Sequence, residues 1–102
     1  MDALSAVAAP VRREILRLVW DDERPAGEIA EAFDVTFGAV SQHLRILREA
    51  GLVEFRREGR HRFYRARKEK MGPIRELLEA MWVDRLKRLR ALAEEREKGE
   101  AR

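Results

Sequence analysis

The 102-residue sequence predicts a mainly α-helical domain that carries one small β-hairpin. Three observations support this expectation. Apolar residues recur at helical spacing up to residue 50, alternating apolar and polar residues surround a Glu-Gly-Arg turn within residues 52–66, and a long helical stripe follows from residue 72. We expect a single domain over residues 1–98, large enough to bury a modest core, and a disordered tail over residues 99–102.

Composition excludes several classes of protein. The chain has no cysteine, so it contains no disulfide, thiolate metal site or thiol redox switch. No apolar run approaches the roughly 20 residues that cross a bilayer, and the N-terminus lacks the basic-then-apolar pattern of a secretory signal. We therefore expect no membrane segment and a cytoplasmic location.

Positive charge is concentrated in the middle of the chain. The net formal charge of the whole chain is only +3. Residues 1–35 contain 4 basic and 8 acidic side chains, residues 36–70 contain 10 and 4, and residues 71–102 contain 8 and 7. Such a segregated basic region can hold contacts to a polyanion that a uniformly mixed surface cannot hold.

The first fifty residues predict several helices in succession. Residues 2–8 can form a short apolar helix, and Pro10 can open a second one because its missing N–H is not needed there. The charged run Asp21–Arg24 breaks this second helix. A third helix over about residues 26–33, a three-residue turn and a fourth helix give the helix-turn-helix arrangement, here at about residues 26–50.

The helix expected over residues 36–50 has a core face and an opposite polar face. Thr36 can cap its N-terminus, and Gly51 stands where a helix ends. Helical spacing places on the core face Val40, Leu44 and Leu47. It places on the polar face Gly38, Ser41, Gln42, Arg45 and Glu49. Small residues permit close approach to a major groove, where serine, glutamine and arginine can hydrogen-bond to base edges or phosphates. The alternative is an ordinary amphipathic helix with a solvated polar face.

A β-hairpin is expected directly after this helix, over about residues 52–66. Residues 52–57 and 61–66 mix apolar and polar character with period two, and residues 58–60 offer a turn. Basic side chains gather around this turn: Arg56, Arg57, Arg60, His61, Arg62 and Arg65. A projecting basic turn suits contact with phosphates or the minor groove, and it would complete a winged helix-turn-helix. Alternatively, the arginines protect the edges of a small sheet against aggregation.

The last segment predicts a long helix over about residues 72–98. Its stripe consists of Ile74, Leu77, Leu78, Met81, Trp82, Arg85, Leu86, Leu89, Leu92 and Ala93. A helix of this length spans about 37 Å, more than so small a body can cover, so we expect the stripe to meet the same helix of a second subunit. The expected dimer contacts are Leu4, Val7, Leu78, Met81, Trp82, Arg85, Leu89 and Leu92. The alternative is a helix that packs within its own chain and ends in a frayed, charged tail.

A known family is recognisable in the run AVSQHLRILREAGLVEFRREGRHRFYR, which resembles the recognition helix and wing of the ArsR family of bacterial winged-helix repressors. The segments APVRREILRLV and GEIAEAF are similar to the two preceding helices of that family. The resemblance implies a homodimer that binds double-stranded DNA at a pseudo-palindromic operator and represses transcription. It also implies groove or phosphate contacts from Thr36, Ser41, Gln42 and His43, and wing contacts from Arg56, Arg57, Arg60 and Arg62.

Two positions depart from the family pattern. Phe37 and Gly38 stand where many relatives carry small polar residues, so Phe37 can either pack on the core or touch a thymine methyl group. His43 lies beside the core stripe, which leaves both packing and DNA contact open. The full set of expected DNA contacts is Thr36, Phe37, Gly38, Ser41, Gln42, His43, Arg45, Arg56, Arg57, Arg60, His61 and Arg62.

We expect no cofactor and no regulatory transition metal. Residues 25–28 contain no cysteine, although arsenic and cadmium sensors that the chain resembles carry a cysteine pair there, and the C-terminal helix contains no histidine. His43 and His61 are the only histidines of the chain. A small organic effector of unknown identity can be envisaged near Met81 and Trp82, but such side chains equally fill a core or a dimer interface.

Enzymatic function is not expected, because the sequence has no cysteine nucleophile, Gly-rich phosphate loop or metal-ligand triad. The competing hypothesis to a sequence-specific DNA-binding regulator is a winged-helix module that binds another protein. RNA binding is disfavoured because no aromatic platform for stacked bases is evident. Salt-dependent binding to an operator would distinguish the DNA-binding hypothesis from the protein-binding one.

Overall fold

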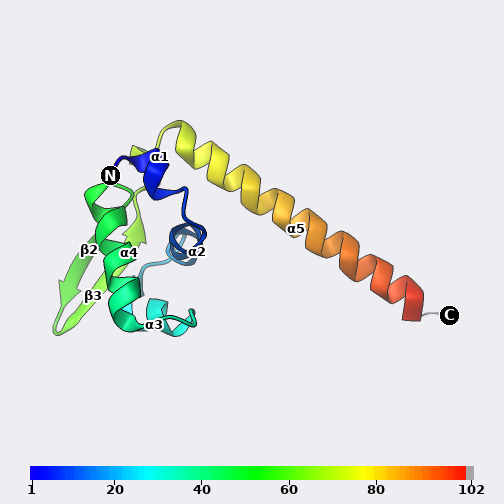
Figure 1. Cartoon of the computed structure of the whole chain (residues 1–102), viewed down its shortest axis with the longest axis horizontal. Helices are drawn as coiled ribbons and strands as arrows, with labels where there is room; N and C mark the ends of the chain where they lie inside the picture. The colour runs from blue at the N-terminus through cyan, green and yellow to red at the C-terminus, as the bar shows by residue number, and fades with distance from the viewer. Residues whose placement is uncertain (101–102) are drawn as a thin grey trace. The chain divides into compact units, whose positions relative to one another are not determined.

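The computed structural model describes residues 1–100 of the chain, and residues 101–102 lie outside this description (Figure 1). The chain forms two compact units, of which the first comprises residues 1–72 and the second is the long helix that begins at Pro73. The sequence predicted one domain over residues 1–98.

Two helices open the chain, as the sequence predicted. Helix α1 (Ala3–Ala6) is shorter than expected, and its first turn is capped by the Asp2 carboxylate, which accepts a hydrogen bond of 2.7 Å from the Ser5 N–H. This hydrogen bond lowers the pKa of the Asp2 carboxyl. Helix α2 (Pro10–Leu18) begins at the proline, and its buried side chains include Ile15 and Leu16.

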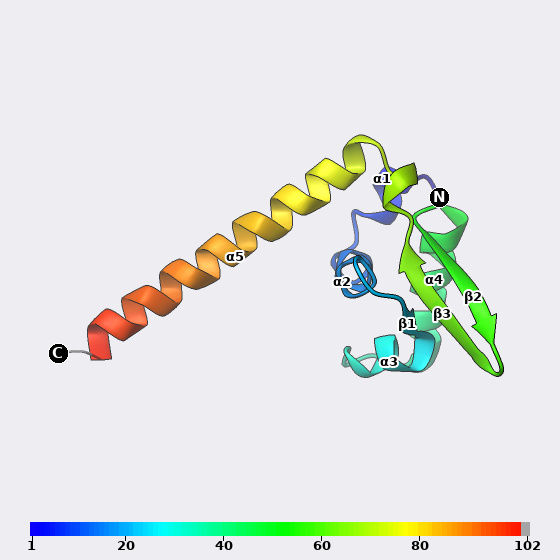
Figure 2. The ribbon, with the colours of Figure 1, turned by 180° about the vertical axis from the view of Figure 1, so that it is seen from behind.

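A short strand, β1 (Arg24–Pro25), was not predicted. The sequence suggested only a break there, whereas the structure pairs Arg24 with Tyr64 and Pro25 with Phe63 in an antiparallel ladder. Two residues are too few to show a periodic pattern. The partner strand lies about forty residues further along the chain, so no local signal in the sequence indicates β1. The resulting sheet has the strand order β1-β3-β2, and β1 leads directly into helix α3 (Ala26–Glu31) (Figure 2).

Helix α4 (Phe37–Glu49) is the recognition helix that the sequence predicted. The Thr36 hydroxyl accepts a hydrogen bond of 3.1 Å from the Ala39 N–H and so caps its first turn. The helix ends before Gly51, whose φ of 78° lies in the left-handed region that favours glycine. The helix contacts α1, α2, α3 and β2, so it lies at the centre of the first unit.

The predicted hairpin is formed by strands β2 (Val53–Glu58) and β3 (His61–Ala66). Gly59 lies in their turn with a φ of 60°. The register pairs Phe55 with Tyr64 and Arg57 with Arg62, whereas the intervening pairs lie on the other face of the sheet. Buried apolar side chains from all parts of the first unit form its core: Ala6, Val7, Ile15, Leu16, Val19, Ile29, Val40, Leu44, Leu47, Leu52, Val53, Tyr64, Ala66 and Met71.

A short 3₁₀ helix (Lys68–Lys70), which was not predicted, precedes the long helix α5 (Pro73–Glu100). Helix α5 has 28 residues, which corresponds to a length of about 42 Å. It runs two residues beyond the predicted end at residue 98, so residues 99–100 of the expected tail are helical. None of the helices described within residues 1–100 combines the length and apolar character that a membrane span requires.

Candidate nucleic-acid interface

The polar face of α4 is exposed along its whole length. The exposed residues of this face are Gly38, Ser41, Gln42, Arg45 and Glu49. The predicted core residues on the opposite face are buried. Arg45 Nε lies 3.0 Å from Glu49 Oε1, but both side chains are more than half exposed, so this ion pair is weak and a phosphate can replace the glutamate.

The hairpin separates its arginines into two sets by strand parity. Arg57 and Arg62 face each other across the ladder on the same side of the sheet as Phe55 and Tyr64. This side meets α4, because the Arg48 guanidinium carbon lies 5.3 Å from the centroid of the Phe55 ring. Arg57 and Arg62 therefore extend from the face of the sheet that contacts the recognition helix.

The opposite side of the hairpin carries arginines that are already paired. Arg56 was expected to contact DNA, but its guanidinium donates hydrogen bonds of 3.0 Å to Glu23 and 2.7 Å to Glu58. The hydrogen bonds raise the pKa of Arg56 above its ordinary value and lower the pKa of Glu23. Arg65 pairs with Glu54 in the same way. Arg56 is thus a structural residue of the wing in this state, and the sequence could not show this because Glu23 lies 33 positions away.

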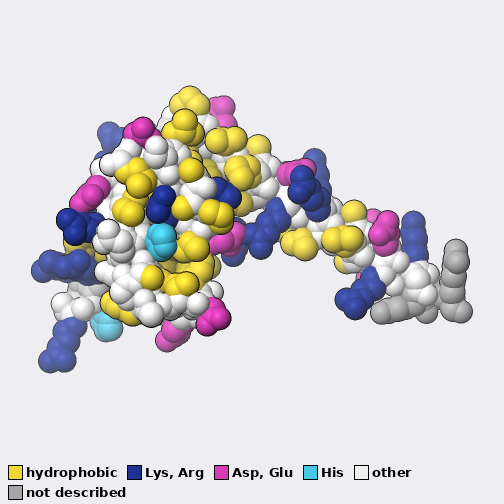
Figure 3. Space-filling model, viewed as in Figure 1, with side chains coloured by type: hydrophobic (Ala, Val, Ile, Leu, Met, Phe, Trp, Pro, Cys, Tyr) yellow, Lys and Arg dark blue, Asp and Glu magenta, His cyan; other side chains and the backbone are white. Residues whose placement is uncertain are grey.

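The tip of the wing has positive charge without a compensating carboxylate. Within residues 1–100, no carboxylate oxygen is described within 4.0 Å of the Arg57, Arg60 or Arg62 guanidinium nitrogens. Together with Gly59 and His61 these arginines line a hollow of about 230 Å³. Lys and Arg side chains gather over this end of the hairpin (Figure 3). The cross-strand pair of like charges is unfavourable by itself, so an anion between the two guanidinium groups would stabilise it.

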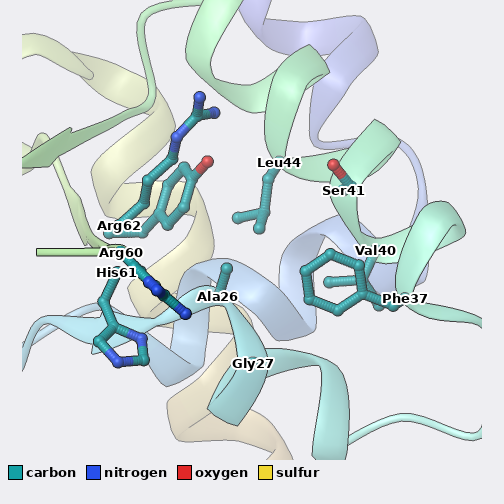
Figure 4. Close-up of a pocket in the computed structure, with 10 residues that line it drawn as sticks. Ala26, Gly27, Phe37, Val40, Ser41, Leu44, Arg60, His61 and Arg62 are labelled. Carbon is teal, nitrogen blue, oxygen red and sulfur yellow. The ribbon is translucent and has the colours of Figure 1, made fainter. Parts of the chain in front are cut away.

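A second hollow, of about 430 Å³, lies between α3, the first half of α4 and strand β3. Figure 4 shows Phe37, Val40 and Leu44 reaching toward it from α4, Ala26 and Gly27 lying on α3, and the basic side chains of β3 at its other side. The Phe37 side chain is 58% exposed, so its expected alternative of packing in the core is wrong. The sequence did not indicate that Ala26, Gly27 and Tyr64 line a hollow. Tyr64 and Arg62 are two positions apart on β3, so their side chains lie on the same face of the sheet.

His43 is held by Arg12 of α2. The Arg12 Nη1 atom lies 3.3 Å from His43 Nδ1, and the same guanidinium donates a hydrogen bond of 2.6 Å to the Ala6 carbonyl oxygen. Arg12 therefore joins the end of α1 to the recognition helix. Partial burial and the nearby Arg12 charge lower the pKa of His43. Of the two roles that the sequence left open for His43, this geometry favours helix packing.

Because its pKa is lowered, His43 makes folding pH-dependent. The unfolded chain titrates near the ordinary value of 6.5, so the stabilisation by neutral His43 is complete above that pH and is lost as pH falls through the lower folded value. We expect the urea midpoint of the native protein to fall more between about pH 7.5 and about pH 5.5 than that of His43→Gln, whose amide oxygen can still accept from Arg12. His61→Gln, on the exposed wing, is the matched control and should behave like the native protein. Equal pH dependence in the native protein and His43→Gln would show that His43 is not the titrating group.

The structure divides the expected dimer contacts into exposed and buried residues. Val7 and Leu78 are buried in the single chain, and their part in a subunit contact stays a prediction. Trp82 is half-buried. The exposed members are Leu4, Met81, Arg85, Leu89 and Leu92. Val83 and Leu86 are also at least half exposed and add to the apolar surface of α5.

Metal-ligand chemistry is sparse in residues 1–100. No group of three histidine, cysteine, aspartate or glutamate side chains in this part of the chain is placed to hold a metal ion. His43 Nδ1 faces the Arg12 guanidinium, which would repel a cation, and His61 lies among the arginines of the wing tip.

Residues 9–54 match a family described as bacterial regulatory protein, arsR family. The chain is 35% identical to the transcriptional repressor SdpR of Bacillus subtilis strain 168 over 63 residues, which cover 62% of this chain and 70% of the repressor.

Solved structures of other proteins share the fold, and two of them illustrate the likeness. A possible transcriptional regulator for arsenical resistance is 40% identical, with a TM-score of 0.69 over 89% of this chain and 95% of the other. The homodimeric winged helix-turn-helix DNA-binding domain of a possible ArsR-family regulator from Mycobacterium bovis is 32% identical, with a TM-score of 0.67 over 78% of this chain and 74% of the other. In both, the likeness extends beyond the residues of α4 and the wing.

Proposed function

The chain belongs to the ArsR family of bacterial regulatory proteins, and we propose that it acts as a homodimeric repressor at a pseudo-palindromic DNA operator. One observation carries this proposal. Ser41 of the exposed polar face of α4 and the uncompensated Arg62 of the wing line the same hollow, so a helix can enter a major groove there while the wing contacts phosphates. No enzymatic activity is proposed.

In this proposal the dimer presents two recognition helices about 34 Å apart, one for each half-site of the operator. Support for a dimer comes from the exposed leucines of α5 and from the homodimeric state of the M. bovis relative. Ser41, Gln42 and Arg45 would contact base edges or phosphates, and Thr36 and the N-terminus of α4 would bind a phosphate. Bound over a promoter, the dimer would exclude the transcription machinery.

We further propose that regulation uses a small organic effector and no transition metal, and that the protein acts in the cytoplasm. The absence of cysteine from the sequence removes the thiolate ligands of arsenic and cadmium sensors. The contact of His43 with Arg12 occupies one of the two histidines of the chain. Both points support an effector that is not a soft metal ion.

The test is binding of the purified full-length protein to the DNA upstream of its own gene, with salt titrated and with EDTA or zinc added. We expect tight binding that weakens steeply with salt and does not respond to either metal treatment. Zinc-dependent release would contradict the metal-independent part of the proposal. Salt-insensitive binding to a protein, without specific DNA binding, would favour the interaction-module hypothesis.

Gln42→Ala should reduce affinity in a sequence-dependent way. A side chain that reads a base contributes about 1–3 kcal/mol of discrimination, so the loss should be large on the native operator and small on operators altered at the contacted base pair. Arg60→Ala is the comparison, because a phosphate contact should weaken all sequences alike. Quantitative gel-shift titrations on a panel of single-base operator variants measure both. If Gln42→Ala lowers the affinity for all operator variants equally, Gln42 does not contact a base.

A further inference from the structure

The hollow between α3, α4 and β3 combines an apolar floor with a cationic rim. Val40 and Leu44 form part of the floor and are almost fully buried, and the Tyr64 side chain is only 6% exposed. The rim includes Arg60 and Arg62, for which no carboxylate partner is described within residues 1–100. Its volume of about 430 Å³ falls in the range of small-molecule sites, which is roughly 300–1,000 Å³.

We propose that this hollow binds a small aromatic monocarboxylate that regulates DNA binding, a role that rests on the proposed repressor function. A guanidinium and a carboxylate form two parallel, charge-assisted hydrogen bonds, so the rim arginines supply the specific contact for the acid group. Phe37 lies at the same hollow with more than half of its side chain exposed, and it can pack against the ring of the ligand.

The same features distinguish such a ligand from the DNA backbone. A phosphate would satisfy the arginines but leave the exposed Phe37 side chain at the hollow uncovered by any apolar group. An aromatic acid matches both parts at once. The site also differs from the location near Met81 and Trp82 that the sequence suggested for an effector, because every lining residue belongs to the first unit.

Regulation would follow from direct competition. Phe37, Ser41, Arg60 and Arg62 line the hollow and also belong to the proposed DNA-binding surface, so ligand and operator cannot both occupy them. No conformational change is needed. At a ligand concentration of about ten times its dissociation constant, competition weakens apparent operator affinity about elevenfold.

Gly27 offers a way to fill the hollow without replacing any of the residues proposed to contact DNA. It lies on the hollow in helix α3, and a Cβ added there meets no other atom within 4 Å. Gly27→Leu should therefore fold and should occupy the space of the ligand. Ala32→Leu, at the exposed end of the same helix and outside the hollow, is the matched control.

The experiment measures binding of benzoate, its uncharged amide benzamide and inorganic phosphate to DNA-free, full-length protein by calorimetry or NMR. Operator affinity is then measured with and without benzoate. We expect benzoate to bind at least tenfold more tightly than the other two probes. Gly27→Leu should lose this binding. Benzoate should weaken operator binding in the native protein and in Ala32→Leu, and it should not change the operator affinity of Gly27→Leu.

Three results would overturn the proposal: equal binding of the three probes, unchanged benzoate binding in Gly27→Leu, or no binding of benzoate to the native protein. Failure of the repressor function would appear differently, as loss of operator binding in the absence of any ligand, because ligand binding is measured without DNA.

Discussion

Leu89→Asp is expected to convert the dimer into monomers and to weaken operator binding by at least a hundredfold. The Leu89 side chain is 54% exposed on α5, and in a subunit interface the new carboxylate would be buried without a partner. A monomer reaches only one half-site and loses the gain from linked binding, which is commonly a factor of about 10²–10⁴. Light scattering coupled to size-exclusion chromatography measures the mass, and gel-shift titration measures the affinity.

Lys87→Gln is the matched control for this substitution. It changes the net charge by the same amount, and its position two residues earlier places it on a different face of the helix. It should leave both mass and affinity unchanged. If Leu89→Asp remains a dimer with full operator affinity, the α5 surface around Leu89 is not the subunit interface.

The double variant Arg57→Gln/Arg62→Gln is expected to lower operator affinity on the order of a hundredfold at moderate salt. It should also reduce the slope of log affinity against log salt by about four, because two phosphate contacts are lost from each of two wings. The physical reason is that these two guanidinium groups lie on the α4 side of the hairpin with no carboxylate described beside them in residues 1–100. The measurement is a salt titration of operator binding.

Arg56→Gln/Arg65→Gln removes the same charge from the opposite side of the hairpin and is the matched control. Both arginines are paired with glutamates, so the salt slope should change little, while the unfolding midpoint should fall because the wing loses its ion pairs. Equal slope changes in the two double variants would mean that only the net charge of the wing matters, and that strand parity does not select the DNA contacts.

The elements that the sequence predicted well are those whose causes are local. Helix α4 follows from a cap at Thr36, a left-handed end at Gly51 and apolar spacing between them, all within sixteen residues. The hairpin follows from the alternation of apolar and polar residues on both sides of the turn at Gly59. Strand β1 and the Arg56–Glu23 ion pair could not be predicted, because each depends on a partner that only the tertiary fold brings near.

The candidate site divides in the same way. The exposed side chains of α4 follow from helical periodicity, so the reading face was identifiable residue by residue. The division of the wing arginines depends on the register of β2 against β3, which places Arg57 opposite Arg62. The hollow beside Tyr64 requires α3, α4 and β3 to meet, which no local pattern in the sequence indicates.

Strand β1 has a consequence for the thermodynamics of DNA binding. It holds the middle of β3 through its pairing with Phe63 and Tyr64, and the ion pair between Glu23 and Arg56 holds the outer strand β2. A hairpin fixed at two points loses little conformational entropy when it meets a phosphate backbone. The wing is therefore expected to dock as a rigid body, without the large entropic penalty and heat-capacity change of a segment that folds as it binds.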